Sequence, residues 1–374
     1  MGFLTRERIA LENLLPGLDD ALAAMPLMDM ERRGNPAFPE FRRLGGPGLL
    51  IPESLGGRGA TPLDAARAQR AIAARAPSLA IATNMHHFTI ATMLELGQPG
   101  ERGPESDLLA MIAHEKLFVA SGFAEGKTGV SIQSSVLQME KGPEGIVLNG
   151  SKRPCSLSES MDLFAASTPA LEGMDTELAV VIVPADAPGL ERRLFWNSPI
   201  LAGAQSEEVV LKNVVVSEED FFPFGSPGRS NPVQDVGFLW FELLITAAYI
   251  GIASGLVERV LSARTGAAAG RVAMATDLEN AMAALEGIAR AMGGGERGND
   301  ELARMIMVRY AAQAAIDRAA SLAFELRGGM AFIESPEMAY LVAATRPLAF
   351  HPPARLSTSD RLDAYLGGSP LVLD

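Results

Sequence analysis

The chain has 374 residues, of which 48% are hydrophobic, and it carries a formal net charge of −13. That length and apolar content suffice for two or three packed domains. The acidic balance argues against a nucleic-acid or anionic-membrane partner, because either would require a basic surface. The single cysteine, Cys155, excludes an intramolecular disulfide and a cysteine-clustered zinc site. The first residues lack the basic-then-apolar pattern of a signal peptide, so we expect a cytoplasmic protein.

The first third of the chain is predicted to be helical. Apolar residues recur at three- and four-residue spacing over residues 5–25 and 60–97, which is typical of helices with one buried face. A turn-rich connection, "LIPESLGGRGAT", lies between them. We therefore predict an N-terminal α-helical domain over residues 1–115.

Short runs that favour β-strands fill the middle of the chain. Examples are the segments "KLFVASG", "GIVLNGSK", "ELAVVIVPA" and "EEVVLKNVVVS". Glycine, proline and asparagine separate these runs at spacings suited to hairpins, and no crossover helix is indicated between them. The pattern predicts a middle domain over residues 116–225, built on an antiparallel sheet.

Helical periodicity returns after the β region and predicts a C-terminal helical domain over residues 226–374. A long, largely buried helix is expected over 237–263, a second one capped by Thr276, and a third over 299–329 that ends at Gly328 and Gly329. The longest apolar stretch, Leu243 to Val257, is shorter than the roughly 20 residues that a membrane span needs. We therefore interpret it as part of a buried helix.

The segment "SGFAEGKTG", residues 121–129, has the composition of a phosphate-binding loop. Such a loop needs four residues between its first glycine and the Gly-Lys pair, followed directly by a helix. Gly122 and Gly126 have only three residues between them, and a strand pattern follows. The segment is therefore better explained as a glycine-rich bend between two strands.

Several segments, taken in order, resemble the acyl-CoA dehydrogenase family. They are "LNGSK", "VVLKNVVVS" and the "GG" that precedes "AFIESPE". Each motif is weak alone, but the ordered set is fairly specific and covers nearly the whole chain. The resemblance implies an α+β fold with an N-terminal helical domain, a central antiparallel β-barrel-like domain and a C-terminal four-helix bundle. It also implies an FAD cofactor, an acyl thioester substrate on CoA or an acyl carrier protein, and a homodimer or homotetramer whose subunits share the flavin sites.

Carried over residue by residue, the resemblance assigns cofactor binding to Phe123, Glu125, Ser131, Ser156, Arg271, Glu325, Gly328 and Gly329. In the flavin-facing loop Glu125 is kept, whereas Ala124 replaces the usual threonine. Pro154 replaces a tryptophan that packs on the flavin. Near the dinucleotide end, Glu325 stands where a glutamine is usual, and a carboxylate there would repel a pyrophosphate unless a cation such as Arg327 offsets it. Either the flavin is held by different side chains, or the site no longer binds one.

Dehydrogenation needs a carboxylate that removes the α-proton of the thioester. The resemblance places this base on the segment "FHPP", where His351 stands at the position of the usual glutamate. A minority of the family carries the base in the first bundle helix, where Glu242 stands one residue from the expected position. Glu242 and His351 are therefore the candidate catalytic residues. The alternatives are that Glu242 lies on an exposed first turn and that His351 is a packed structural residue.

The substrate pocket is assigned by the resemblance to His86, His87 and Trp240. Adjacent residues on a helix point in different directions, so at most one of the two histidines faces that pocket. No Asp, Glu or Cys lies close to them in the sequence, so we expect no metal site.

These residues are compatible with four functions. The first is flavin-dependent α,β-dehydrogenation of an acyl thioester. The second is a flavin monooxygenase on the same scaffold, which needs no α-proton base and fits the missing glutamate and the altered loop better. The third is a flavin-independent isomerase, lyase or cyclase that acts on an acyl thioester with a general base alone. The fourth is a scaffold role without catalysis.

Overall fold

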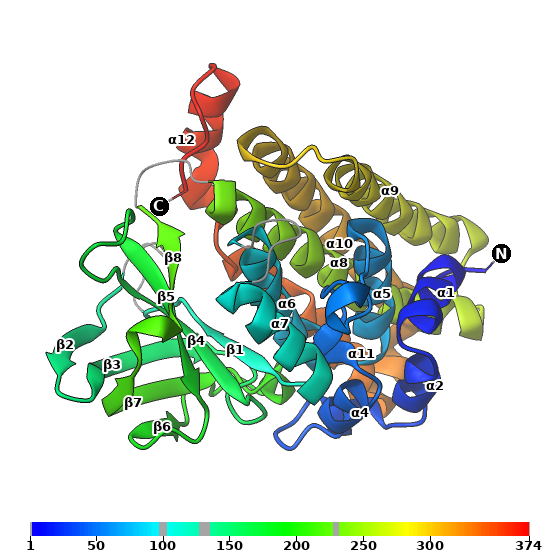
Figure 1. Ribbon diagram of the computed structural model, residues 1–374. Coiled ribbons are helices and arrows are strands. Elements are labelled where there is room, and N and C mark those ends of the chain that lie inside the picture. Colours follow the sequence, from blue (N-terminus) through cyan, green and yellow to red (C-terminus); the bar gives the residue numbers. More distant parts are fainter. Residues whose placement is uncertain (1, 97–102, 127–134, 227–231, 374) are drawn as a thin grey trace.

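The computed structural model describes residues 2–96, 103–126, 135–226 and 232–373. Helices, then strands, then helices follow one another along the chain (Figure 1). The mixed helix-and-sheet class expected from the sequence is confirmed.

The N-terminal helices lie between residues 5 and 115. They are α1 (Thr5–Leu14), α2 (Leu18–Ala23), α3 (Leu27–Met30), α4 (Ala37–Arg43), α5 (Pro62–Arg75), α6 (Pro77–Leu96) and α7 (Pro104–Glu115), with short 3₁₀ turns η1 (Gly46–Gly48) and η2 (Glu53–Leu55). Thr61 caps α5 because its hydroxyl accepts a hydrogen bond from the amide of Asp64 at 3.2 Å, with Pro62 at the first helical position. Helix α6 is buried along most of its length.

Two four-stranded sheets form the middle of the described chain. The strands are β1 (Val119–Gly122), β2 (Gln138–Gly142), β3 (Gly145–Cys155), β4 (Leu163–Pro169), β5 (Leu178–Pro184), β6 (Leu190–Arg193), β7 (Glu207–Val216) and β8 (Phe221–Gly225), with turns η3 (Ala202–Ala204) and η4 (Glu218–Asp220). One sheet has the order β1-β4-β5-β8 and the other β2-β3-β7-β6.

The expectation of a purely antiparallel sheet is wrong for one pair. Strands β1 and β4 run parallel, with Val119 opposite Leu163 and Gly122 opposite Ala166. Between them the chain visits the other sheet through β2 and β3, and this long excursion acts as the crossover that a parallel pair requires. The other strand pairs in the described sheets are antiparallel.

The C-terminal part contains three long helices within the described ranges. They are α8 (Pro232–Ala263), α9 (Ala268–Gly293) and α10 (Asn299–Glu334), followed by the shorter α11 (Pro336–Ala344), turn η5 (Arg346–Phe350) and α12 (Arg355–Leu366). One local prediction is corrected: Thr276 lies inside α9 rather than at its start, because helical residues from Ala268 onward precede it. The predicted end of the third helix at Gly328 is confirmed, because Gly328 has the non-helical angles φ 76° and ψ 170°; the α10 range joins two helices across this kink.

Helix α8 lies at the centre of the helical part (Figure 1). In the part of the chain that the structure describes, α8 is the single helix long and apolar enough to cross a membrane. Its most apolar 18-residue segment is 94% buried inside the protein. The prediction of a buried helix is thus confirmed. Helix α5 approaches α8 closely, because a Cβ on Gly251 would lie 2.4 Å from the carbonyl oxygen of Arg70. Only glycine permits that backbone contact.

A buried carboxylate joins the three parts of the chain. Glu31 accepts hydrogen bonds from the backbone amide of Ser78 at 2.9 Å, from the Ser78 hydroxyl at 2.6 Å and from the Tyr340 hydroxyl. Tyr340 in turn accepts a hydrogen bond at 2.9 Å from the amide of Leu201, in the β region. Burial raises the pKa of Glu31 to about 7, although the hydrogen bonds from Ser78 and Tyr340 act in the opposite direction.

This raised pKa predicts a pH-dependent stability difference between the protein and its Glu31→Gln variant. The folded state binds the Glu31 proton more tightly than the unfolded state. The folding stability that this proton contributes is therefore complete below pH 4.5 and is lost as pH rises through about 7. The variant should gain stability relative to the wild type over that window, by on the order of 3 kcal/mol. Melting curves of both proteins from pH 4.5 to 8 measure it. A constant difference in melting temperature would contradict the assignment.

Candidate active site

Five phenylalanine rings meet where the three parts of the chain join. Phe88 of α6 lies 5.2 Å from Phe123, 5.9 Å from Phe238 and 6.0 Å from Phe241, measured between ring centroids. Phe123 lies 5.1 Å from Phe224 of β8. All five are at least nine-tenths buried. We call this cluster the aromatic junction; it brings Phe123, which is predicted to bind the flavin, into direct contact with the N-terminal helices and with β8.

His351 borders the aromatic junction from the C-terminal segment. Its ring lies 6.2 Å from that of Phe241, and its Nε2 atom shares a hydrogen bond of 3.0 Å with the Tyr249 hydroxyl. Burial, with a smaller contribution from the charge of Arg309, lowers the pKa of His351 to about 3. The imidazole is therefore neutral at physiological pH. No hydrogen bond to its other nitrogen, Nδ1, is found among the described residues.

Glu242 is fully buried and paired with an arginine. Both of its carboxylate oxygens lie 2.8 Å from Nη1 of Arg309, which is 1% exposed. Burial raises the pKa of Glu242, while the charge of Arg309 and its hydrogen bonds oppose that rise. The alternative of an exposed first turn is wrong, because Glu242 lies well inside α8. The carboxylate is bound rather than free, and its role as a base stays a prediction.

A second buried ion pair lies at the loop that is predicted to face the flavin. Lys152 of β3 donates hydrogen bonds to Glu125, to Ser167 at 3.0 Å and to Ser135 at 3.2 Å. Both charged side chains are at most 2% exposed. Burial lowers the pKa of Lys152, and the neighbouring carboxylate opposes that shift. The carboxylate atom Oε2 of Glu125 has no hydrogen-bond partner in the described chain.

The β region also offers hydroxyl groups that suit a polar cofactor. The Ser156 hydroxyl shares a hydrogen bond of 2.9 Å with that of Ser206. The buried Ser121 hydroxyl, in β1, has no partner within the described ranges. Buried hydroxyls are rarely left unpaired, so Ser121 and the free atom of Glu125 fit a ligand with several hydrogen-bonding groups, such as a flavin. Ser131, also predicted to bind it, lies outside the described residues.

The two histidines of α6 differ in their surroundings. His86 has both ring nitrogens occupied: Nε2 lies 2.8 Å from the carbonyl oxygen of Pro47, and Nδ1 accepts from the amide of Val119 at 3.0 Å. His87 is buried with neither nitrogen bonded in the described parts of the chain, and burial lowers its pKa well below the usual value. Trp240 is half-buried on α8. Their substrate-binding roles stay predictions, with His86 serving the fold.

The residues predicted for the dinucleotide end of FAD lie on α9 and α10. Nη1 of Arg271 donates hydrogen bonds to backbone carbonyls of residues 264–266, the loop between α8 and α9. That loop packs on the stretch of α10 just before Gly328. Glu325, Gly328 and Gly329 are exposed. Arg271 is thus already engaged by its own loop.

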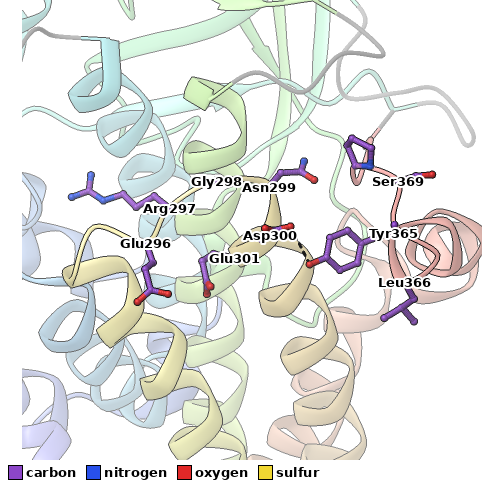
Figure 2. A pocket seen from close by; sticks show the side chains of 11 residues that line it. Glu296, Arg297, Gly298, Asn299, Asp300, Glu301, Tyr365, Leu366 and Ser369 are labelled. Carbon is purple, nitrogen blue, oxygen red and sulfur yellow. Dashed lines mark hydrogen bonds between the residues drawn. The ribbon is translucent and has the colours of Figure 1, made fainter.

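A pocket of about 940 Å³ lies elsewhere, between the α9–α10 turn and the C-terminal tail (Figure 2). It is lined by residues 296–301 and by residues near the end of α12, and the Tyr365 hydroxyl donates to Asp300 at 3.2 Å. None of the residues predicted for a site lines it. Within the described residues no group of three or more His, Cys, Asp or Glu side chains could hold a metal ion.

Comparison with known proteins defines the class of the protein. No family model matches the chain. Isobutylamine N-hydroxylase of Streptomyces viridifaciens is 44% identical over 381 residues, which cover 100% of both proteins. L-evernosamine nitrososynthase of Micromonospora sp. is 26% identical over 69% of this chain and 61% of its own length. Among solved structures, FMN-bound TdsC from Paenibacillus sp. A11-2 has a TM-score of 0.81 at 18% identity, covering 98% of this chain and 99% of its own.

The chain therefore belongs to the acyl-CoA dehydrogenase superfamily, as the motifs predicted, and is an oxidising enzyme on that scaffold. Within the superfamily its sequence groups with isobutylamine N-hydroxylase.

Sequence reasoning missed three residues that shape this region: Lys152, Tyr249 and Arg309. Lys152 lies in the quoted "LNGSK" motif, but the neighbouring Asn149, Ser151 and Arg153 are polar as well, so nothing in the pattern marks Lys152 as the buried charge. Arg309 gave a signal, since it interrupts an apolar helical pattern, but nothing in the sequence connects it to Glu242. Tyr249 carried no signal that separates it from the rest of the buried helix.

The Lys152→Met variant should be strongly destabilised, because it leaves the buried Glu125 carboxylate without its cation. Removing one partner of a buried pair costs about 3–5 kcal/mol. A matched control is Lys141→Met at the exposed pair of Lys141 with Glu218, where solvent screening should leave stability nearly unchanged. Urea unfolding of both variants measures this, and equal midpoints for the two would contradict the buried pair's importance.

Proposed function

We propose that the chain is a flavin-dependent monooxygenase that hydroxylates the nitrogen of a small primary aliphatic amine. The main support is the 44% identity with isobutylamine N-hydroxylase along the full length of both proteins. The nitrososynthase relative is named for oxidation to a nitroso group. This function corresponds to the monooxygenase alternative, which is better supported than the dehydrogenation of an acyl thioester.

The geometry of the site supports this choice over dehydrogenation. Removal of an α-proton needs a carboxylate that is free to accept it. The position of the usual base holds His351, whose pKa of about 3 makes it a weak base. Glu242 is bound on both oxygens by Arg309. Oxygen transfer to nitrogen needs neither residue as an α-proton base, since the nitrogen lone pair is itself the nucleophile.

A flavin would be held by the β region. Ser121, Ser156 and the loop at Glu125 offer polar atoms, and Phe123 offers an apolar face. When bound in its reduced form, the flavin supplies two electrons and activates oxygen. FMN is favoured over FAD because Arg271 is already engaged by its own loop and Glu325 would repel a pyrophosphate. FMN is also the flavin bound to TdsC.

The remaining residues would bind and orient the amine. The aromatic junction offers an apolar surface for a short alkyl chain, and the neutral His351 offers Nδ1 to the nitrogen end of the substrate. In the balanced reaction, amine, oxygen and reduced flavin give hydroxylamine, water and oxidised flavin. One oxygen atom forms the N–O bond and the other leaves as water. An external two-electron donor must regenerate the reduced flavin.

Product analysis tests the function directly. The purified protein is supplied with FMN, NADH, a flavin reductase and isobutylamine under ¹⁸O₂. We expect N-isobutylhydroxylamine with one labelled oxygen in mass spectrometry, and none when the protein is omitted. Butanoyl-CoA with an artificial electron acceptor serves as the comparison substrate. Turnover of butanoyl-CoA without any oxidation of amines would overturn the proposal.

The pH dependence of kcat/KM should follow the substrate rather than His351. Only a neutral amine has the lone pair that forms the N–O bond, and primary alkylamines have a pKa of about 10.4. We therefore expect kcat/KM to rise about tenfold per pH unit between pH 6 and 8. His351, with its pKa lowered to about 3, should add no inflection in that range. An inflection near pH 6.5 that disappears in His351→Ala would contradict this.

A further inference from the structure

Arg309 occupies a buried position between α8 and the segment that carries His351. Its Nη2 donates to the backbone carbonyls of Leu348 at 2.9 Å and His351 at 2.6 Å. Its Nη1 donates to the carbonyl of Pro352 at 3.3 Å and to Glu242. One side chain of α10 therefore holds three carbonyls of a five-residue stretch.

The sequence explains why this stretch needs an outside donor. It runs "LAFHPP", and prolines 352 and 353 have no backbone N–H with which to build a turn or a strand. Phe350 is 80% exposed, so its ring does not anchor the segment. Leu348 packs inside, but a single apolar contact does not fix the direction of the following residues. The carbonyls that Arg309 binds would otherwise be left partly unsatisfied.

Glu242 offsets the free-energy cost of burying the charged guanidinium of Arg309. An unpaired charge in the interior is disfavoured by several kcal/mol, and both oxygens of Glu242 face Nη1 of Arg309 at 2.8 Å. Tyr249, two turns further along α8, then bonds the ring of His351. The backbone of His351 is thus held by α10 and its ring by α8.

We propose that Arg309 is a positioning residue that places His351 at the aromatic junction, with Glu242 acting as the balance of its charge rather than as a base. The inference rests on the proposed function. Glu242 and Arg309 are then expected to affect turnover together, and only because they hold His351 in position.

A double variant separates positioning from charge burial. Arg309→Met together with Glu242→Leu removes both charges and keeps apolar volume, a replacement that often preserves or raises stability. The fold should survive, whereas the three carbonyls lose their donor. We expect a fall in kcat of about 10–100-fold, with more hydrogen peroxide released per NADH consumed. Full activity in this variant would overturn the inference.

A mutant cycle tests whether the effect passes through His351. In the His351→Ala background, the same two substitutions should lower kcat by less than about twofold, because residues that act as a unit are not additive. If the kcat losses of the double variant and of His351→Ala multiply, the pair acts independently of His351 and the inference fails. Should the double variant not fold, Arg309→Lys takes its place in the cycle with the same two outcomes, because it keeps the charge beside Glu242 but lacks the guanidinium fork that binds the three carbonyls.

A readout without turnover separates this inference from the proposed function. The chain has four histidines, so the ¹⁵N spectrum of selectively labelled protein is simple, and His351→Ala identifies its ring signals. We expect those signals to shift or broaden in the double variant while those of His86 and His87 stay unchanged. If no amine is oxidised by the wild type, the proposed function fails while this result still stands. Unchanged His351 signals would contradict the positioning role.

Discussion

The structure depends above all on how the buried carboxylate of Glu242, on helix α8, is paired. This helix is buried on nearly all sides, and Glu242 lies within its apolar run. A carboxylate there requires a cation with good geometry, because the low dielectric of the interior penalises an unpaired charge. Arg309 satisfies that requirement from α10. The same guanidinium then has donors left over, and these fix the direction of the C-terminal segment.

A similar solution is found in the β region. There Lys152 and Glu125 form a buried pair whose lysine also binds Ser135 and Ser167. In the first case the guanidinium binds backbone carbonyls of a segment that contains two prolines. In the second the lysine binds the side-chain hydroxyls of Ser135 and Ser167, and so it links β3 to β4. A buried ionic hydrogen bond is directional, so each pair fixes the relative position of the segments that it joins.

Prediction from sequence worked where the signal is local. The order of helices, strands and helices follows from apolar periodicity, and the motif around Lys152 led to the correct superfamily. It failed where the cause is distant: the parallel pairing of β1 with β4 depends on an excursion through the other sheet. The partner of Glu242 lies 67 positions away, and no local pattern joins them. Thr276 has the chemistry of a cap, but the residues before it continue the helix.

The same pairing bears on the chemistry that the scaffold can support. A free carboxylate beside a primary amine would stabilise the ammonium form and raise the pKa of the amine, because opposite charges favour ionisation. The ammonium ion has no lone pair for an N–O bond. Glu242 and Glu125 both carry cationic partners, which weakens that effect. For the proposed amine substrate, a scaffold with a neutral His351 at the usual base position and with both carboxylates paired holds no free anion that would favour the ammonium form.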